Sequence, residues 1–553
     1  MAEGLAGEGS KGAALEPSVP IERLVYPGPD EAACGVASGA WTSETVGEVI
    51  VRQSWELGAE TALVDPGRRL SFSELAAETQ AVAEHLLSIG LRPADRVLLQ
   101  VGTGCDAAVW ILAAFRAGIV PVCAVPQYRD YEMAALGRLS GARAHVVEPA
   151  ASPNFDLLEL ACRLREDNPA LEHLLTIGAA PDSEKPSPML PRLNTLDVAA
   201  FQLSGGTTGV PKIIPRFHGE YMGYAAAWAA RLQLTRSDVL LWSLPIAHNA
   251  GMICFLLPAL WSGATLVLMP RFETSEFLET IERERVTVTG SIGPIAPKLL
   301  DVKDPSQFDL RSVRLFLTLN RAAEIEQHLG VAAMNIFGIT EGLLMASPPV
   351  VGPELRHTTV GSPVSPGDEV EVHEPGTDLV VADGEIGELC FRGPSRLRGY
   401  FNDADATRSA LTSSGFFKTG DLVRVVAREG QRQFAFEGRA KDNIDRGGEK
   451  FGTAEIEAML SGHPQIGEVC VVGMPDRYLG ERVCAFVIPR SPADVPTTDD
   501  LSGYLLERGV AKFKLPERVV QLSEMPVTSV GKLDRPALKR RIAEIIDADA
   551  AEA

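Results

Sequence analysis

The stretch "SGGTTGVPK", residues 204–212, combines glycines, hydroxyl side chains and a lysine within nine positions. Glycines leave backbone N–H groups open to a ligand, and hydroxyl and ammonium groups add donors, so this composition suits phosphate binding. The spacing is not G-x-x-x-x-G-K-[ST], because Val210 and Pro211 precede Lys212. A flexible surface turn is the alternative, but the strand-like "AAFQL" before the loop favours phosphate. The candidates are Ser204, Gly205, Thr207, Thr208 and Lys212.

A second motif, "FGITEG", places an aromatic ring, a hydroxyl and a carboxylate on a glycine-flanked turn at residues 337–342. Glu341 could hold a hard cation, Thr340 a phosphate oxygen and Phe337 a flat base. A plain turn with a capping acid explains the same residues. The motif therefore indicates nucleotide binding only in combination with the other motifs.

Three further segments carry candidate groups. In "FKTGDLVR", Asp421 could accept both hydroxyls of a ribose, although aspartates are common in turns for local reasons. "EGRAKDNIDRGGEKFGTAEIE", residues 437–457, is either a charged linker or a hinge with a binding edge. "PVTSVGKLDR" isolates Lys532 on a glycine-containing loop, where an exposed lysine is the default interpretation.

A dinucleotide site is not supported. "GTGCDA", residues 102–107, matches G-x-G-x-x-A between an expected strand and helix. The next expected strand, "IVPVCAV", ends in "PQYRD" without an acid placed to take a ribose. A tight strand-to-helix turn explains the glycines better, which argues against an oxidoreductase.

Composition and charge limit the function classes. The chain has 553 residues, 45% of them hydrophobic, and a net charge of −21, which argues against nucleic acid or an anionic membrane as the main partner. Its eight cysteines form no C-x-x-C pair, as expected of reduced thiols in a cytoplasmic protein. The start of the chain lacks a secretory signal, and "GMICFLLPALW" is too short to span a bilayer.

Strand-like and helix-like runs alternate from residue 95 onward, which predicts crossover units and largely parallel sheets. After about residue 365, short strands with glycine turns predict an antiparallel sheet or distorted barrel. We therefore expect a disordered leader at 1–20, a large α/β domain at 21–439 and a smaller domain at 440–553.

Taken together and in this order, the motifs resemble the adenylate-forming superfamily, which includes acyl-CoA synthetases, luciferases and peptide-synthetase adenylation domains. The resemblance extends from about residue 40 to about residue 546 and is greatest to stand-alone aryl-acid AMP ligases. "FQLSGGTTGVPKIIPRFHGEY", "LPIAHN" and "MPDRYLGER" look like that branch. The resemblance implies α/β architecture: a large N-terminal domain with helix-flanked parallel sheets and a distorted β-barrel, and a small mobile α+β C-terminal domain.

The resemblance also implies roles for ATP and Mg²⁺. Thr207, Thr208 and Lys212 would contact the β- and γ-phosphates, while Thr340 and Glu341 would serve phosphate and the metal. The adenine would lie beside Phe337 and Gly338, and the ribose would be held by Asp421 and Arg439.

The C-terminal domain of this family moves between two half-reactions. Lys532 would bridge the substrate carboxylate and the α-phosphate, then withdraw as the domain swings about a hinge at Lys441. The loop of Arg446, Gly447 and Gly448 would then face an incoming pantetheine thiol.

The acid substrate depends on "AHNAGMIC". His248 would lie beside the carboxylate and Asn249 beside an ortho substituent, to which its amide can donate or from which it can accept; without the family, Asn249 would be a helix cap. Ala250 and Cys254 replace a Tyr and a Ser of dihydroxybenzoate enzymes, and "LTLNRAAE", residues 317–324, replaces a Gly-Gly-Ala segment. We therefore keep salicylate, dihydroxybenzoate, anthranilate and hydroxyanthranilate as candidate acids.

The sequence thus predicts ATP-dependent activation of an ortho-substituted aromatic acid, followed by transfer to the phosphopantetheine of an aryl carrier protein in siderophore or nonribosomal peptide synthesis. An aryl- or acyl-CoA ligase that uses free CoA is the alternative. A non-catalytic carrier-binding or ATP-sensing relative should have lost Lys532, Glu341 or Asp421, and all three are present.

Overall fold

The structure is a computed structural model that describes residues 16–178, 188–204, 210–291, 295–428, 431–439, 443–491, 494–526 and 533–552. Five of the expected site residues lie outside these ranges: Gly205, Thr207, Thr208, Lys441 and Lys532.

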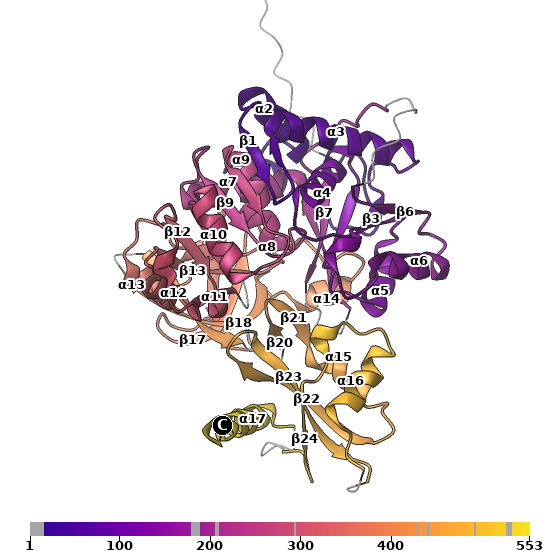
Figure 1. The fold of residues 1–553 in the computed structure, drawn as a ribbon, viewed down its shortest axis with the longest axis vertical. Coiled ribbons are helices and arrows are strands. Elements are labelled where there is room, and N and C mark those ends of the chain that lie inside the picture. The colour runs from indigo at the N-terminus through magenta and orange to yellow at the C-terminus, as the bar shows by residue number, and fades with distance from the viewer. Residues whose placement is uncertain are drawn as a thin grey trace, which may run out of the picture.

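Two largely parallel sheets form the large N-terminal part (Figure 1). One has nine strands in the order β15-β14-β13-β12-β11-β9-β10-β1-β2, parallel from β13 to β1 and antiparallel at both ends. Its strands are β1 (Thr61–Val64), β2 (Arg69–Ser71), β9 (Val239–Trp242), β10 (Thr265–Leu268), β11 (Val288–Ser291), β12 (Leu315–Thr318), β13 (Ala333–Gly338), β14 (Leu344–Ala346) and β15 (Ser362–Pro363).

The second sheet has six strands in the order β6-β5-β3-β4-β7-β8, parallel except for the pair β7 and β8. Its strands are β3 (Arg96–Gln100), β4 (Val120–Ala124), β5 (Ala144–Val147), β6 (His173–Thr176), β7 (Val198–Ser204) and β8 (Lys212–Phe217). The alternation of strands and helices in the sequence therefore gives parallel sheets, as expected.

Helices cover both sheets. α3 begins with a capping box, in which Ser71 and Glu74 each satisfy a backbone N–H of the other. α4 is buried on nearly every side, so its sequence is apolar without an amphipathic period. The helices are α1 (Pro29–Ala37), α2 (Val46–Glu56), α3 (Phe72–Ser88), α4 (Cys105–Ala117), α5 (Asp130–Ser140), η1 (Pro149–Ala151), α6 (Leu157–Asp167), α7 (His218–Leu232), α8 (Asn249–Gly251), η2 (Met252–Leu256), α9 (Leu257–Ser262), α10 (Thr274–Glu284), α11 (Ile295–Leu300), η3 (Pro305–Gln307), α12 (Ala322–Leu329), α13 (Pro353–Thr358) and α14 (Ala404–Ser409).

The region expected to form an antiparallel sheet or distorted barrel contains a four-stranded antiparallel sheet. Its strands pair in chain order: β16 (Glu369–His373), β17 (Ile386–Arg392), β18 (Phe417–Arg428) and β19 (Gln431–Arg439).

The small C-terminal part has its own five-stranded sheet, in which β24 runs parallel to β23 and the other pairs are antiparallel. Figure 1 shows the hairpin β20–β21 at the junction with the large domain, and β24 and α17 at the opposite end. The elements are β20 (Asn443–Arg446), β21 (Glu449–Gly452), α15 (Thr453–Leu460), β22 (Ile466–Asp476), β23 (Gly480–Pro489), α16 (Thr498–Leu506), η4 (Lys512–Lys514), β24 (Arg518–Gln521) and α17 (Arg535–Glu552).

The end of the expected disordered leader is held in place. The backbone N–H groups of Ser18 and Val19 donate to the Asp197 carboxylate over 2.7 and 3.2 Å. A buried carboxylate accepts such bonds strongly, and the composition of the leader gave no sign of this partner. Residues 1–15 lie outside the described part of the chain.

A buried ion cluster joins the two parts. The Lys514 ammonium lies 3.1 Å from a carboxylate oxygen of Glu132 on α5 and 3.1 Å from one of Glu455 on α15. All three side chains are almost completely buried. Burial alone would lower the pKa of Lys514, but the two carboxylates outweigh it and raise that pKa above its usual value.

None of the helices in the described ranges is long and apolar enough to cross a membrane.

The ion cluster predicts that Glu132→Gln loosens the junction. The substitution removes the one carboxylate charge that the large domain contributes to the cluster. Lys514 stays paired with Glu455, so the C-terminal part remains intact. The Ala511 amide, which donates to Glu132 over 3.3 Å, should exchange its hydrogen at least about tenfold faster, since breaking a buried ion pair costs a few kcal/mol.

Glu159→Gln is the matched control, because Glu159 pairs with Arg163 on an exposed helix face. Equal protection of residues 509–513 in both variants would contradict the role assigned to Glu132.

Candidate active site

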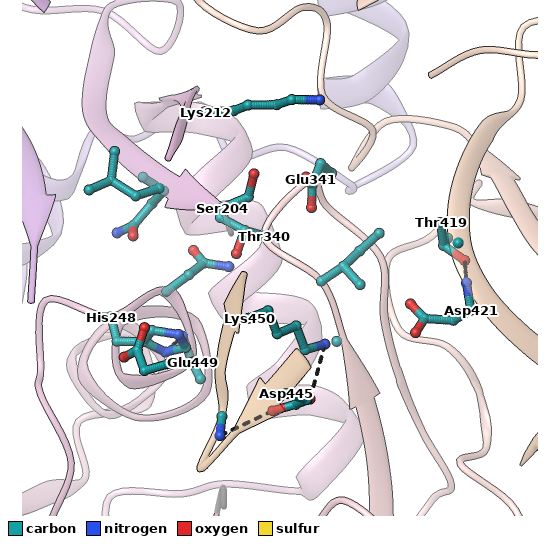
Figure 2. A pocket seen from close by; sticks show the side chains of 18 of the residues that line it. Ser204, Lys212, His248, Thr340, Glu341, Thr419, Asp421, Asp445, Glu449 and Lys450 are labelled. Carbon is teal, nitrogen blue, oxygen red and sulfur yellow. Dashed lines mark hydrogen bonds and ion pairs between the residues drawn. The ribbon is translucent and has the colours of Figure 1, made fainter. Parts of the chain in front are cut away.

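One cavity of about 280 Å³ lies where the two large sheets, the four-stranded sheet and the hairpin β20–β21 meet. Figure 2 shows charged and polar side chains from all of these segments around it. Ten of the predicted site residues line it: Ser204, Lys212, His248, Asn249, Cys254, Gly338, Thr340, Glu341, Asp421 and Gly448.

The two ends of the glycine-threonine loop are held together by strand pairing. Ser204 ends β7 and Lys212 begins β8, and these two residues are partners in the antiparallel ladder. Both of these residues line the cavity. The Lys212 ammonium lies 4.5 Å from the centre of the Tyr400 ring, a distance typical of a cation–π contact.

Tyr400 also contacts Glu341, because its hydroxyl donates to a Glu341 carboxylate oxygen over 2.9 Å. Burial and the neighbouring Glu341 charge raise the pKa of Tyr400, so its hydroxyl keeps the proton that it donates. One aromatic residue thus places the carboxylate and the ammonium at the same end of the cavity.

The donor set at this end fits Mg²⁺ bound together with a nucleotide. Magnesium in such sites is held by one or two carboxylates and by phosphate oxygens, and Glu341 offers one carboxylate to the cavity (Figure 2). No cluster of three or more His, Cys, Asp or Glu side chains within the described ranges could hold a metal alone. Bound Mg²⁺ would take its other ligands from nucleotide phosphates and water.

Asp421 and Arg439 are brought together by the four-stranded sheet. They are paired residues of β18 and β19. The turn before Asp421 is fixed by the Gly420 amide, which donates to Glu388 over 2.9 Å, and by the Thr419 hydroxyl, which donates to the Leu389 carbonyl over 2.8 Å. Asp421 is 2% exposed and lines the cavity, as a carboxylate that holds ribose hydroxyls would.

His248 is the N-cap of α8, because its Nδ1 accepts the Ala250 amide over 3.2 Å. Burial lowers the pKa of His248 to about 4. The neutral ring therefore carries its proton on Nε2, where it can act as a hydrogen-bond donor in the cavity. The helix-cap role proposed for Asn249 as an alternative thus belongs to His248.

Asn249 is 5% exposed and lines the cavity. The next residues form a π-helical segment, η2, between α8 and α9, and Trp228 donates to the Cys254 carbonyl there over 3.0 Å. This wider turn places both Ile253 and Cys254 on the cavity wall. Burial raises the pKa of the Cys254 thiol, so the wall is uncharged.

The hairpin β20–β21 brings a second set of groups from the C-terminal part. Its turn residues Gly447 and Gly448 have φ of 65° and 94°, as a two-residue hairpin loop requires. Gly448 lines the cavity together with Glu449 and Lys450, whereas Arg446 pairs with Glu517 over 2.8 Å. Burial raises the pKa of Glu449 to about 7.

Phe337 is not brought to the cavity. Residues alternate across a strand, so Ile336 and Gly338 of β13 line the cavity while Phe337 faces the opposite side. Its ring is 6% exposed and lies 6.3 Å from the ring of Phe436, centre to centre.

The segment that replaces the family's Gly-Gly-Ala divides between two cavities. Leu319 lines the active-site cavity, but Asn320 and Arg321 line a neighbouring one of about 380 Å³ between the two parts of the chain. Arg321 pairs there with Glu324 over 3.0 Å. The two cavities share Leu319, Asn443, Asp445 and Gly448.

The sequence analysis missed several lining residues. Tyr400 stands in no recognisable motif, and Gln202 received no role although it lies within the quoted "FQLSGGTTGVPKIIPRFHGEY". Glu449 and Lys450 lay within the quoted "RGGEK" and could have been found, since they directly follow the glycines of the hairpin turn.

Comparison with known proteins finds AMP-binding enzymes that match most of the chain. Residues 52–401 match the AMP-binding enzyme family, and residues 455–532 match the AMP-binding enzyme C-terminal domain. A 2,3-dihydroxybenzoate-AMP ligase from Bacillus subtilis is 34% identical, with 94% of this chain and 97% of the relative covered. A salicyl-AMP ligase / salicyl-S-ArCP synthetase from Mycobacterium tuberculosis is 34% identical, with 93% of each chain covered.

Among solved structures, the apo structure of MbtA from Mycobacterium smegmatis superposes with a TM-score of 0.71 at 30% identity, covering 94% of this chain and 98% of the other. Sequence and fold agree over both the large and the small domain, so the chain belongs to the AMP-binding enzyme family, whose members are adenylate-forming ligases.

Proposed function

We propose that the protein activates an ortho-substituted aromatic carboxylic acid with ATP and Mg²⁺, then transfers the acyl group to the phosphopantetheine thiol of an aryl carrier protein. The observation that carries this proposal is one cavity with two unlike ends. Lys212, Glu341 and Asp421 offer charge for a nucleotide, while Asn249 and Cys254 lie on the wall for a ring. The similar dihydroxybenzoate and salicylate ligases support the same class of acid.

In the first half-reaction a substrate carboxylate oxygen attacks the α-phosphorus of ATP, and pyrophosphate leaves. The substrate is its own nucleophile, so the protein needs only to align the reactants and neutralise charge. Ser204, Lys212 and the loop between them would hold the β- and γ-phosphates, and Asp421 with Arg439 would hold the ribose. Bound Mg²⁺ would neutralise phosphate charge, with Glu341 as its protein ligand.

His248 would orient the acid. A neutral Nε2–H can donate to a carboxylate oxygen without forming an ion pair that would weaken its nucleophilicity. Lys532 would supply the positive charge at the α-phosphate.

In the second half-reaction the thiol sulfur attacks the acyl carbonyl carbon, the thiol proton is lost, and AMP leaves. The present orientation suits this step, because the turn of the hairpin β20–β21 lines the active-site cavity. The neighbouring cavity shares four lining residues with it and is a route for a pantetheine arm.

Free CoA is the competing acceptor. A cluster of cations for its 3′-phosphate would favour it; Arg321, Arg477 and Lys539 line the second cavity, and the two arginines pair there with Glu324 and Asp301. The similar salicyl-S-ArCP synthetase supports a carrier protein. We propose a role in siderophore or nonribosomal peptide synthesis.

We also propose that the protein works in the cytoplasm. None of the eight cysteines, all of them among the described residues, forms a disulfide, which suits a reducing compartment. The acidic charge of −21 disfavours nucleic acid and anionic membranes as partners.

Acid-dependent ATP–pyrophosphate exchange tests the proposed function. The acids are benzoate, salicylate, 2,3-dihydroxybenzoate, anthranilate, 3-hydroxyanthranilate and a medium-chain fatty acid. We expect exchange with ortho-substituted rings, and a loss of about tenfold or more for benzoate, which leaves the Asn249 amide without a partner. Exchange only with the fatty acid, or equally with benzoate, would favour the CoA-ligase alternative.

Lys532→Ala should abolish adenylation while sparing ATP binding and thiol transfer, because the charge is needed only where the α-phosphorus is attacked. Pyrophosphate exchange measures the first step, and transfer from a supplied aryl-AMP measures the second. Lys303→Ala, which changes an exposed lysine away from the cavity, is the control. Near wild-type exchange by Lys532→Ala would refute the assignment.

The lowered pKa of His248 predicts a pH profile. Because the ring is neutral above a pKa of about 4, its Nε2–H is retained, and exchange should show no inflection from His248 near its usual pKa of about 6.5. Labelled-histidine NMR, assigned with His248→Gln, measures the titration. A His248 signal that titrates near 6.5 would contradict the neutral-donor role.

A further inference from the structure

Three buried side chains behind the acid end of the cavity form a hydrogen-bonded chain. Gln202 on β7 donates through Nε2 to the Tyr221 hydroxyl over 3.0 Å. Tyr221, on α7, donates in turn to Asn249 Oδ1 over 2.9 Å. Gln202 is 1% exposed and Tyr221 is fully buried, so the chain is shielded from bulk water.

A backbone carbonyl at one end of this hydrogen-bonded chain fixes which groups donate and which accept. Gln202 Nε2 also donates to the Ala247 carbonyl oxygen over 3.3 Å, and a carbonyl can only accept. The Gln202 amide therefore presents its nitrogen, not its oxygen, to Tyr221. The Tyr221 oxygen is occupied as an acceptor, and its own proton goes to Asn249.

This hydrogen-bonded chain leaves the Asn249 amide able to act toward the cavity only as a hydrogen-bond donor. Its oxygen is held by Tyr221, and none of the described residues accepts a hydrogen bond from its Nδ2. Burial raises the pKa of Tyr221 well above its usual value, so the tyrosine remains a donor at any physiological pH. Asn249 thus offers an N–H group to the cavity that it lines.

We propose that Gln202 and Tyr221 are specificity-determining positioning residues, which lock the Asn249 amide as a donor and so select an ortho-hydroxy acid over an ortho-amino acid. This inference rests on the proposed function and narrows its substrate class. A phenol oxygen accepts from Nδ2. An aromatic amine turns N–H toward Nδ2 and has a lone pair delocalised into the ring, so a buried donor is left without an acceptor.

The test is the ratio of kcat/KM for salicylate to that for anthranilate, measured by pyrophosphate exchange. Wild type should favour salicylate by about tenfold or more, the cost of one unpaired buried donor. Tyr221→Phe keeps the ring but frees the Asn249 amide to turn its oxygen to the cavity. The ratio should then fall by about tenfold, while KM for ATP stays constant.

Tyr224→Phe is the matched control. Tyr224 is also buried on α7, but its hydroxyl donates to the Gly342 carbonyl, so its loss should change exchange with both acids by the same factor. A purely structural effect of Tyr221→Phe would change kcat/KM for both acids by the same factor and leave their ratio unchanged. That result would overturn the proposal.

The wild-type ratio is a test even if Tyr221→Phe does not fold. Equal use of salicylate and anthranilate, or a preference for anthranilate, would overturn this inference and leave the aryl-acid function standing. No exchange with any aromatic acid would overturn the proposed function, and this inference with it.

Discussion

The ammonium of Lys514 lies between two almost fully buried carboxylates, one from each domain, and this charge cluster joins the domains in the orientation described here. A charge buried so deeply is tolerated only when its partners are close and well placed. Glu455 belongs to the same domain as Lys514, whereas Glu132 belongs to the other. The cluster is therefore complete only when the domains meet in this orientation, and the same orientation brings the hairpin β20–β21 to the cavity.

This arrangement divides the proposed site residues between the two domains. The residues proposed to hold the ribose, the acid and the metal lie on β18 and β19, on α8 and in the segment after β13, all within the large domain. In the proposed mechanism, the groups that differ between the two half-reactions come from the C-terminal domain. The chemistry would then change while the bound acid and nucleotide keep their places.

Much of the site followed from the sequence because its residues lie at the ends of strands or in turns with recognisable composition. Ser204 and Lys212 bracket a glycine loop, and Asp421 follows a glycine turn, so their places depend on local structure. The parallel sheets followed for the same reason, from the alternation of apolar segments. The loop residues 205–209 and Lys532 lie outside the described part of the chain.

Other features depend on packing that no local pattern encodes. The faces of β13 could not be assigned from "FGITEG", so Phe337 was expected at the nucleotide although its neighbours line the cavity. Gln202, Tyr221 and Asn249 are separated by 19 and 28 positions, and the direction of their hydrogen bonds depends on the Ala247 carbonyl. Tyr400 joins Lys212 to Glu341 from a segment without a chemical signature.

The hairpin β20–β21 beside the cavity bears on how long the acyl-adenylate of the proposed reaction would survive in water. An acyl-adenylate is a mixed anhydride that water would destroy, and its value to the cell is lost if it escapes before the acceptor arrives. With the hairpin in place, Gly448, Glu449 and Lys450 form part of the cavity wall. The turn residues Gly447 and Gly448 have no side chains, so the proposed acceptor arm would meet only backbone there. In the proposed mechanism, the domain that admits the thiol would thus also protect the acyl-adenylate from hydrolysis.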